Sequence, residues 1–215
     1  MRDVPSPCPS VCCAMLVVGF DLDMTLVDSR PGIRASFEAL SAETGVPVDV
    51  EAVLARIGPK LETELAYWFP ADAIADAAVA YRRHYWDLCV TGTELLPGAR
   101  SAVDAIRAGG GNVIVVTAKA EPHARRCLDA VGLAIDDVAG HVHGEEKAVA
   151  LTAAGARVYV GDTTADIAAA IGAHAVAVGV TTGPHARADL EAAGADVVLA
   201  TLEAFPAWLE QLPPT

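Results

Sequence analysis

The chain has 215 residues, which at about 150 residues per domain predicts one domain with a large insertion or two small domains. Hydrophobic residues make up 53% of the sequence and charged residues 20%, a composition typical of a globular protein and not of a disordered one. The formal net charge is −13, and the 15 basic residues are scattered, which argues against a nucleic-acid partner. No apolar run approaches the roughly 20 residues of a membrane span, so no membrane partner is expected.

The amino-terminal residues 1–14 contain three prolines and three of the five cysteines, Cys8, Cys12 and Cys13. We predict that they form a disordered leader. The cysteines have neither zinc-ligand spacing nor an even number, which favours reduced thiols and a cytoplasmic location. The apolar run Val11–Phe20 could be part of a signal peptide, but it continues directly into acidic residues, and a core strand is favoured.

Short valine-rich runs alternate with helical patterns through most of the chain. The helical patterns include Ala99–Ala108 and Pro122–Val131, each followed by a glycine. The runs lack polar alternation, as expected for strands covered on both faces. They predict strands at Leu16–Phe20, Asn112–Thr117, Val138–Val142, Arg157–Gly161, Ala175–Val180 and Asp196–Leu199. This order predicts an α/β fold with a doubly wound, Rossmann-like parallel sheet.

Residues 31–93 interrupt this alternation, because they contain helical patterns and no convincing strand. We predict helices at Pro31–Thr44, Asp49–Arg56, Lys60–Trp68 and Ala71–Cys89. The sequence therefore predicts an α/β core formed by residues 15–30 and 94–215, with a small helical domain at 31–93 inserted after the first strand.

The segment Phe20–Ser29 (FDLDMTLVDS) carries the strongest chemical signal. Asp21 and Asp23 are two residues apart at the end of the first predicted strand, so in an extended chain they point the same way. They lie at the carboxyl edge of the predicted sheet, where open α/β folds bind ligands. Two carboxylates this close require a cation or a shared proton.

Three further motifs follow at strand ends or helix starts. Thr117 ends a buried strand, and Lys147 opens a helical pattern behind two glutamates. Asp162 and Asp166 follow a strand in the run Gly161–Asp166. Taken singly, a strand-end threonine, a lysine beside glutamates and an aspartate at a helix start are ordinary caps or solvated ion pairs. All of these motifs together, in this order and each at a strand end or helix start, form a specific pattern that ordinary caps and ion pairs do not explain.

The complete set resembles the four-motif signature of the haloacid dehalogenase superfamily, and the helical insertion resembles the cap of that family. The match covers about residues 15–200. The first motif and the loop Gly179–Gly183 are most similar to the phosphoglycolate phosphatase branch. Two positions depart from the pattern: Met24 stands where the family usually has glycine, and Ala148 follows Lys147 where the branch commonly has proline.

The resemblance implies a phosphatase that acts through an aspartyl-phosphate, with Asp21 as nucleophile and Asp23 as general acid and base. It also implies Mg²⁺, an ion that favours oxygen ligands, held by Asp21, the backbone carbonyl of Asp23, and Asp162, with Asp166 orienting the ligands from behind. The phosphate-binding residues would be Thr117, Ala118 and Lys147.

The cap loop between two predicted helices carries Arg56 and Lys60, which we regard as possible substrate contacts. The pair Lys119 and Glu121 is predicted to be a solvated turn. Four further residues are not assigned to the site. His141 and His143 are interpreted as ordinary surface or core residues, and Cys89 and Cys127 as packing residues.

The expected substrate is a small phosphorylated metabolite, and the sequence does not distinguish phosphoglycolate from other phosphomonoesters. The alternatives are a phosphomutase or another hydrolase of the same superfamily, or a phospho-aspartate signalling or binding protein without turnover. The sequence leaves both a monomer and a homodimer open.

Overall fold

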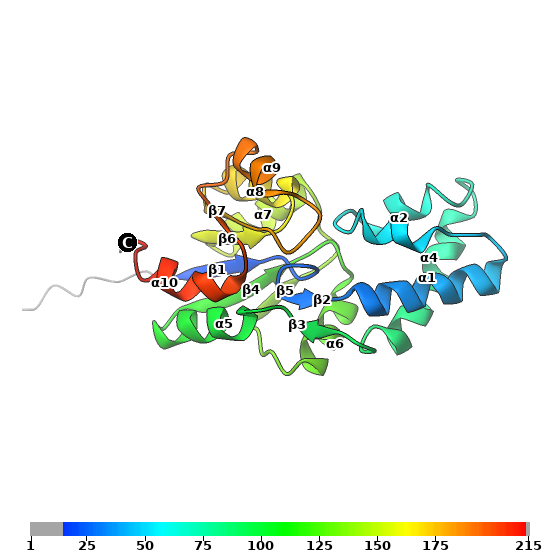
Figure 1. The fold of residues 1–215 in the computed structure, drawn as a ribbon, viewed down its shortest axis with the longest axis horizontal. Helices are drawn as coiled ribbons and strands as arrows, with labels where there is room; N and C mark the ends of the chain where they lie inside the picture. Colours follow the sequence, from blue (N-terminus) through cyan, green and yellow to red (C-terminus); the bar gives the residue numbers. More distant parts are fainter. Residues whose placement is uncertain (1–14, 214–215) are drawn as a thin grey trace, which may run out of the picture.

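Strand β1 (Val17–Phe20) lies at the centre of a six-stranded parallel sheet in a computed structural model that describes residues 15–213 (Figure 1). The strand order is β5-β4-β1-β6-β7-β8. From β1 the chain builds one side of the sheet outward and then crosses over to build the other. The other strands are β4 (Asn112–Val116), β5 (Asp137–Ala139), β6 (Val158–Gly161), β7 (Val176–Val180) and β8 (Val197–Leu199). The predicted fold class is confirmed, and the leader predicted at residues 1–14 lies outside the described residues.

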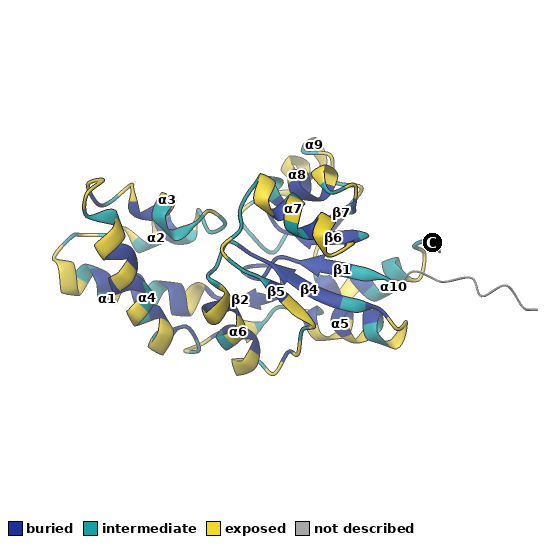
Figure 2. Ribbon diagram, turned by 180° about the vertical axis from the view of Figure 1, so that it is seen from behind, coloured by how far each residue is buried: buried dark blue, intermediate teal, exposed yellow. Residues whose placement is uncertain are grey.

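Both faces of the sheet are covered, so the strands carry apolar side chains in both directions (Figure 2). Along β4, Val113 and Val115 pack into one apolar cluster, and Ile114 and Val116 pack into the other. The first face is covered by α5 (Ala99–Ala108), α6 (Glu121–Ala130) and α10 (Phe205–Leu209), the last preceded by a short 3₁₀ helix, Leu202–Ala204. The second face is covered by α7 (Glu145–Ala153), α8 (Thr164–Gly172) and α9 (Arg187–Ala192).

The inserted helices form a separate lobe beside the carboxyl edge of the sheet (Figure 1). They are α1 (Arg30–Thr44), α2 (Val50–Leu54), α3 (Leu61–Leu65) and α4 (Ile74–Leu88). Their buried side chains make an apolar cluster of their own, which also contacts Cys127 on α6. The longest of these helices have 15 residues, and no helix within residues 15–213 combines the length and apolarity needed to cross a membrane.

Two short strands, β2 (Val27–Asp28) and β3 (Glu94–Leu95), pair antiparallel where the chain leaves and re-enters the core. The sequence analysis did not predict them, because a two-residue strand has no periodicity to detect. They bring the two ends of the insertion side by side.

The predicted elements differ from the observed ones mainly in length. The second and third inserted helices are shorter than predicted, and the strand predicted at Val138–Val142 ends at Ala139. That strand stops because the next residues turn against α6: a Cβ on Gly140 would lie 2.4 Å from the Glu121 nitrogen, and His141 has a φ of 62°. The two histidines His141 and His143 therefore do not share a strand.

Candidate active site

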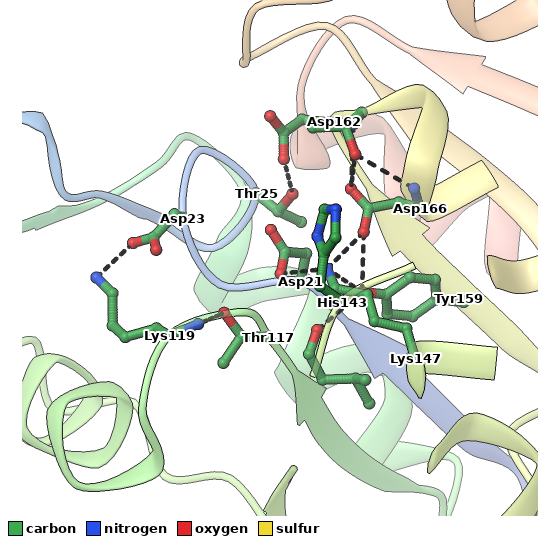
Figure 3. Close-up of polar contacts among 12 residues, drawn as sticks. Asp21, Asp23, Thr25, Thr117, Lys119, His143, Lys147, Tyr159, Asp162 and Asp166 are labelled. Carbon is green, nitrogen blue, oxygen red and sulfur yellow. Dashed lines mark hydrogen bonds and ion pairs between the residues drawn. The ribbon is translucent and has the colours of Figure 1, made fainter. Parts of the chain in front are cut away.

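Three of the predicted site residues directly follow the ends of adjacent strands. Asp21 follows β1, Thr117 follows β4, and Asp162 follows β6. Because β4, β1 and β6 are neighbours in the parallel sheet, their carboxyl ends bring these side chains to one edge, where α/β folds bind ligands (Figure 3).

Lys147 is the cation at the centre of this edge. Its Nζ lies 2.9 Å from Asp21 Oδ1 and 2.7 Å from Asp166 Oδ1, and it donates to the Tyr159 hydroxyl at 3.1 Å. Burial disfavours the charged ammonium, but the carboxylates of Asp166 and Asp21 raise the pKa of Lys147 well above its usual value. Lys147 therefore does not form a solvated ion pair with the neighbouring glutamates. It lies in the buried cluster with Asp21 and Asp166.

Asp166 caps a helix and also contacts the buried lysine, whereas its predicted role of orienting metal ligands stays a prediction. It completes a capping box at the start of α8, where its Oδ2 accepts from the Thr163 nitrogen at 3.1 Å and from Thr163 Oγ1 at 2.6 Å. Its Oδ1 accepts from Lys147 and from the Tyr159 hydroxyl. Burial opposes its charge, but Lys147 and Thr163 lower the pKa of Asp166 below its usual value, so this carboxylate is ionised.

Asp162 is only half satisfied by the protein. Its Oδ1 accepts from Thr25 Oγ1 at 2.9 Å, whereas its buried Oδ2 has no hydrogen-bond partner. A Cβ at position 183 would lie 1.7 Å from this oxygen, so only glycine leaves room there. Burial, together with the charges of Asp166 and Asp21, raises the pKa of Asp162 well above its usual value.

The three carboxylates Asp21, Asp162 and Asp166 place one oxygen each within 4.8 Å of one another, and this acidic triad could hold a metal ion. Lys147 supplies one positive charge for the three buried groups. The pKa of Asp21 is raised to about 7, first by burial and also by the charge of Asp166. A surplus of buried negative charge and an unpartnered carboxylate oxygen are what a hard divalent cation with oxygen ligands would satisfy. The donor set therefore fits Mg²⁺.

Asp23 does not belong to the acidic triad, because its carboxylate pairs with a different lysine, Lys119. Figure 3 shows its carboxylate turned toward Lys119, whose Nζ lies 2.6 Å from Asp23 Oδ1. The prediction that Lys119 lies in a solvated turn with Glu121 is wrong: only 8% of the Lys119 side chain is exposed, and Glu121 binds Arg125 instead. Lys119 Nζ also donates to the Tyr85 hydroxyl on inserted helix α4. The sequence signal that could have identified Lys119 is its position two residues after Thr117, because the loop after β4 returns toward β1 and brings Lys119 to Asp23.

The loop after Asp21 makes a tight turn at Met24, which is buried and has a φ of 60°. This left-handed conformation is strained for a residue with a Cβ. It supplies a physical reason for the glycine that the resembling family usually has at this position. The turn is held by the Met24 nitrogen donating to the Val27 carbonyl at 2.9 Å and by the Thr182 hydroxyl donating to the Met24 carbonyl at 2.5 Å.

The cap-loop residues contact the core beside this site, at the starts of α7 and α8. Gly58 packs against Thr163, and Lys60 forms an ion pair of 2.6 Å with Glu146 on α7. Arg56, and not Lys60, lines a cavity of about 110 Å³ that opens onto Asp21 and Asp23. Ala118 also lines this cavity. A substrate contact by either cation stays a prediction.

The residues not assigned to the site are placed as follows. Cys89 and Cys127 are buried free thiols, in agreement with packing roles. His143 lies beside the cluster of Asp21 and Lys147, where partial burial and the Lys147 charge lower its pKa (Figure 3). Within residues 15–213, neither His141 nor His143 belongs to a group of potential metal ligands.

The parallel α/β sheet and the acidic edge limit the class of protein, and a comparison with family models specifies it. The family model described as haloacid dehalogenase-like hydrolase matches residues 15–174. The chain belongs to this family, and the resemblance inferred from its motifs is confirmed.

Several relatives match most of the chain, among them a probable phosphatase and a phosphoglycolate phosphatase. The probable phosphatase IndB of Dickeya dadantii is 30% identical, over 86% of this chain and 89% of its own length. The plasmid-encoded phosphoglycolate phosphatase of Cupriavidus necator is also 30% identical, over 92% of this chain and 93% of its own. A crystal structure of a predicted phosphatase from Clostridium acetobutylicum superposes with a TM-score of 0.80 over 92% of this chain and 99% of its own, at 22% identity, which supports the fold.

A third relative is longer. Tyrosine-protein kinase PtkA of Mycobacterium tuberculosis is 36% identical over 119 residues, which are 54% of this chain and 40% of PtkA. The match thus spans about two fifths of that relative.

Proposed function

We propose that the protein is a Mg²⁺-dependent phosphatase that hydrolyses a phosphomonoester of a small metabolite, the class to which phosphoglycolate belongs. The observation that carries this proposal is the buried cluster in which Asp21 meets one lysine, Lys147, and two further carboxylates, one with an unpartnered oxygen. Two relatives along nearly the full length are named as phosphatases, which supports the same activity.

In this proposal Asp21 Oδ attacks phosphorus in line with the ester oxygen and forms an aspartyl-phosphate. Asp23 in its protonated form gives its proton to the departing alcohol, becomes the carboxylate that pairs with Lys119, and then takes a proton from the water that hydrolyses the acyl phosphate. After both displacements at phosphorus, Asp21 is free again and Asp23 has regained its proton, so the enzyme is unchanged.

The other residues stabilise charge and hold positions. Lys147 Nζ, fixed by Asp166 and Tyr159, faces the phosphoryl oxygens, and Thr117 and Ala118 hold them from the end of β4. Mg²⁺ would be held by Asp21, the Asp23 carbonyl and Asp162, and when bound it supplies positive charge to the phosphoryl group. Asp166 keeps Lys147 in place.

The inserted helices act as a cap in this proposal. The contacts of Gly58 with Thr163 and of Lys60 with Glu146 close the lobe over Asp21 and limit the access of bulk water. We place the protein in the cytoplasm, with Cys89 and Cys127 kept as the free thiols that the structure contains.

The test is phosphate release from an aryl phosphate with Mg²⁺, with chelator, and by Asp21→Asn. We expect turnover only for the wild-type protein with Mg²⁺. Full activity of Asp21→Asn or in chelator would refute the mechanism. Transfer of phosphate to a second substrate position would indicate a mutase, and a stable phospho-Asp21 without turnover would indicate a signalling or binding protein.

A further inference from the structure

The cavity of about 110 Å³ next to Asp21 and Asp23 is where the alcohol part of a phosphomonoester would lie, because it is the space between the nucleophile and the inserted helices. The residues that line the cavity therefore indicate which kind of alcohol the enzyme accepts as the leaving group. This inference rests on the phosphatase activity proposed above and narrows its substrate.

One wall of the cavity is aromatic. Phe37, Tyr81 and Tyr85 all line it, and their rings are in contact: the centroids of Phe37 and Tyr81 are 4.6 Å apart, and those of Tyr81 and Tyr85 are 5.6 Å apart and stacked. Ile33 and Val53 extend the same apolar surface. A wall of this kind favours an apolar body, and its rings favour a flat one.

The cations that line the cavity are already engaged. Arg56 donates twice to the buried carboxylate of Glu64, at 3.1 and 2.6 Å, and its guanidinium lies over the Tyr67 ring at 4.5 Å. Arg82 pairs with Glu62 at 2.6 Å, and Lys119 pairs with Asp23 at 2.6 Å.

The one lining histidine adds no positive charge at neutral pH. Burial and the charge of Lys119 lower the pKa of His123, whose Nε2 is 3.2 Å from the Arg82 carbonyl.

A substrate carboxylate in this cavity would have to share a guanidinium whose positive charge a glutamate already balances. If Arg56 turned away from Glu64, the remaining described donor to the Glu64 carboxylate would be Trp68 Nε1, at 2.9 Å. A buried carboxylate that loses its cation is strongly destabilised. A neutral group would leave all three ion pairs intact.

The cavity also holds a neutral polar group. Tyr81 lines it within electrostatic reach of Asp23, and none of the hydrogen bonds found within residues 15–213 involves the Tyr81 hydroxyl. This hydroxyl is available to a hydroxyl, ether or carbonyl of the substrate.

We propose that the substrate is the phosphomonoester of an uncharged, largely apolar alcohol or phenol that packs on Phe37, Tyr81 and Tyr85, and that hydroxycarboxylates and second phosphates are selected against.

The experiment compares kcat/KM for three substrates with the full-length enzyme and Mg²⁺: benzyl phosphate, phosphoglycolate, and phosphoglycolamide, the neutral isostere of phosphoglycolate. We expect benzyl phosphate to be best, and the amide to exceed the carboxylate about tenfold or more, a discrimination within the range of pocket contacts. Phosphoglycolate turnover equal to or faster than that of the amide would overturn the inference and leave the phosphatase in place. No phosphate release from any of the three by an enzyme that still hydrolyses an aryl phosphate would also overturn the inference, whereas no release from the aryl phosphate either would overturn the phosphatase itself.

A charge-neutralising variant tests the cause. Glu64→Gln frees the Arg56 guanidinium inside the cavity, so kcat/KM for phosphoglycolate should rise relative to the amide. Glu43→Gln is the matched control, because Glu43 binds Arg83 and His84 of the inserted helices and does not line the cavity. An unchanged amide-to-carboxylate ratio in a folded Glu64→Gln protein would contradict the role of the engaged arginine.

Discussion

Lys119 Nζ lies 2.6 Å from Asp23 Oδ1, which ties the loop after β4 to the loop after β1. Both side chains are largely buried, with 8% and 14% of their surfaces exposed, so this ion pair is weakly screened. The same ammonium contacts the Tyr85 hydroxyl and lies 4.6 Å from the centre of its ring. Lys119 is therefore the link between the proposed acid and base, Asp23, and the inserted helices.

Replacing this lysine should affect turnover more than binding. In Lys119→Met the Asp23 carboxylate loses the cation that orients it, and we expect kcat to fall about tenfold to a hundredfold, the lower part of the range for general acid–base catalysis. Steady-state kinetics with an aryl phosphate would measure kcat and KM separately. Arg125→Gln is the control, because Arg125 binds Glu121 on the exposed side of α6. A loss confined to KM would argue against the positioning role.

Removing the charge of Asp162 should uncouple stability from metal binding. Because burial and two neighbouring carboxylates oppose ionisation of Asp162, Asp162→Asn should unfold in chelator at a temperature equal to or above that of the wild type. The wild type should be stabilised by Mg²⁺, by about 2.7 kcal/mol at a hundredfold excess over Kd. The variant should lose this gain. Thermal unfolding with and without Mg²⁺ measures both, and a Mg²⁺ shift of wild-type size in Asp162→Asn would exclude Asp162 as a ligand.

The metal-free protein should become less stable as pH rises toward neutrality. The pKa of Asp21 is raised from 3.8 to about 7 in the folded protein, mainly by burial. Between these values the folded state holds a proton that the unfolded state has lost, so the free energy of unfolding falls with increasing pH, by at most about 1.4 kcal/mol per pH unit for one proton. Above about pH 7 this contribution is constant.

Urea unfolding in chelator from pH 5 to 8 would measure this dependence, with Asp21→Asn as the comparison. The variant lacks the titrating group, so the stability of Asp21→Asn relative to wild type should increase with pH across this range. A difference independent of pH would show that Asp21 does not titrate there.

The strained turn at Met24 can be examined with a pair of variants. Met24→Ala and Met24→Gly both remove the buried side chain, which should cost about 2–5 kcal/mol in alanine. Only glycine also removes the Cβ that opposes a φ of 60°. The glycine variant should therefore be more stable than the alanine variant by about 1 kcal/mol. Chemical denaturation of both proteins decides it, and an alanine variant at least as stable as glycine would show that the turn is not strained.

Much of the site followed from position along the chain alone. Asp21, Thr117 and Asp162 each stand one residue beyond a valine-rich strand, and parallel strands bring such positions to one edge. The roles of Lys119 and Tyr159 did not follow in this way. Lys119 resembles a surface lysine beside a glutamate, and Tyr159 resembles a core residue until its hydroxyl is seen to contact Lys147 and Asp166.

The sequence by itself determined the α/β fold, the helical insertion and the identity of the acidic residues, because strand periodicity and helix caps are local properties of the chain. Tertiary structure alone decided how each charge is balanced. Lys147 lies between Asp21 and Asp166, Lys119 binds Asp23, and Arg56 binds Glu64, over separations of 8 to 126 residues. Electrostatic interaction depends on distance in space and on burial, and neither can be read from the order of residues. A chain of net charge −13 can therefore expose its acidic surface and still build a site that is suited to an anionic phosphate ester.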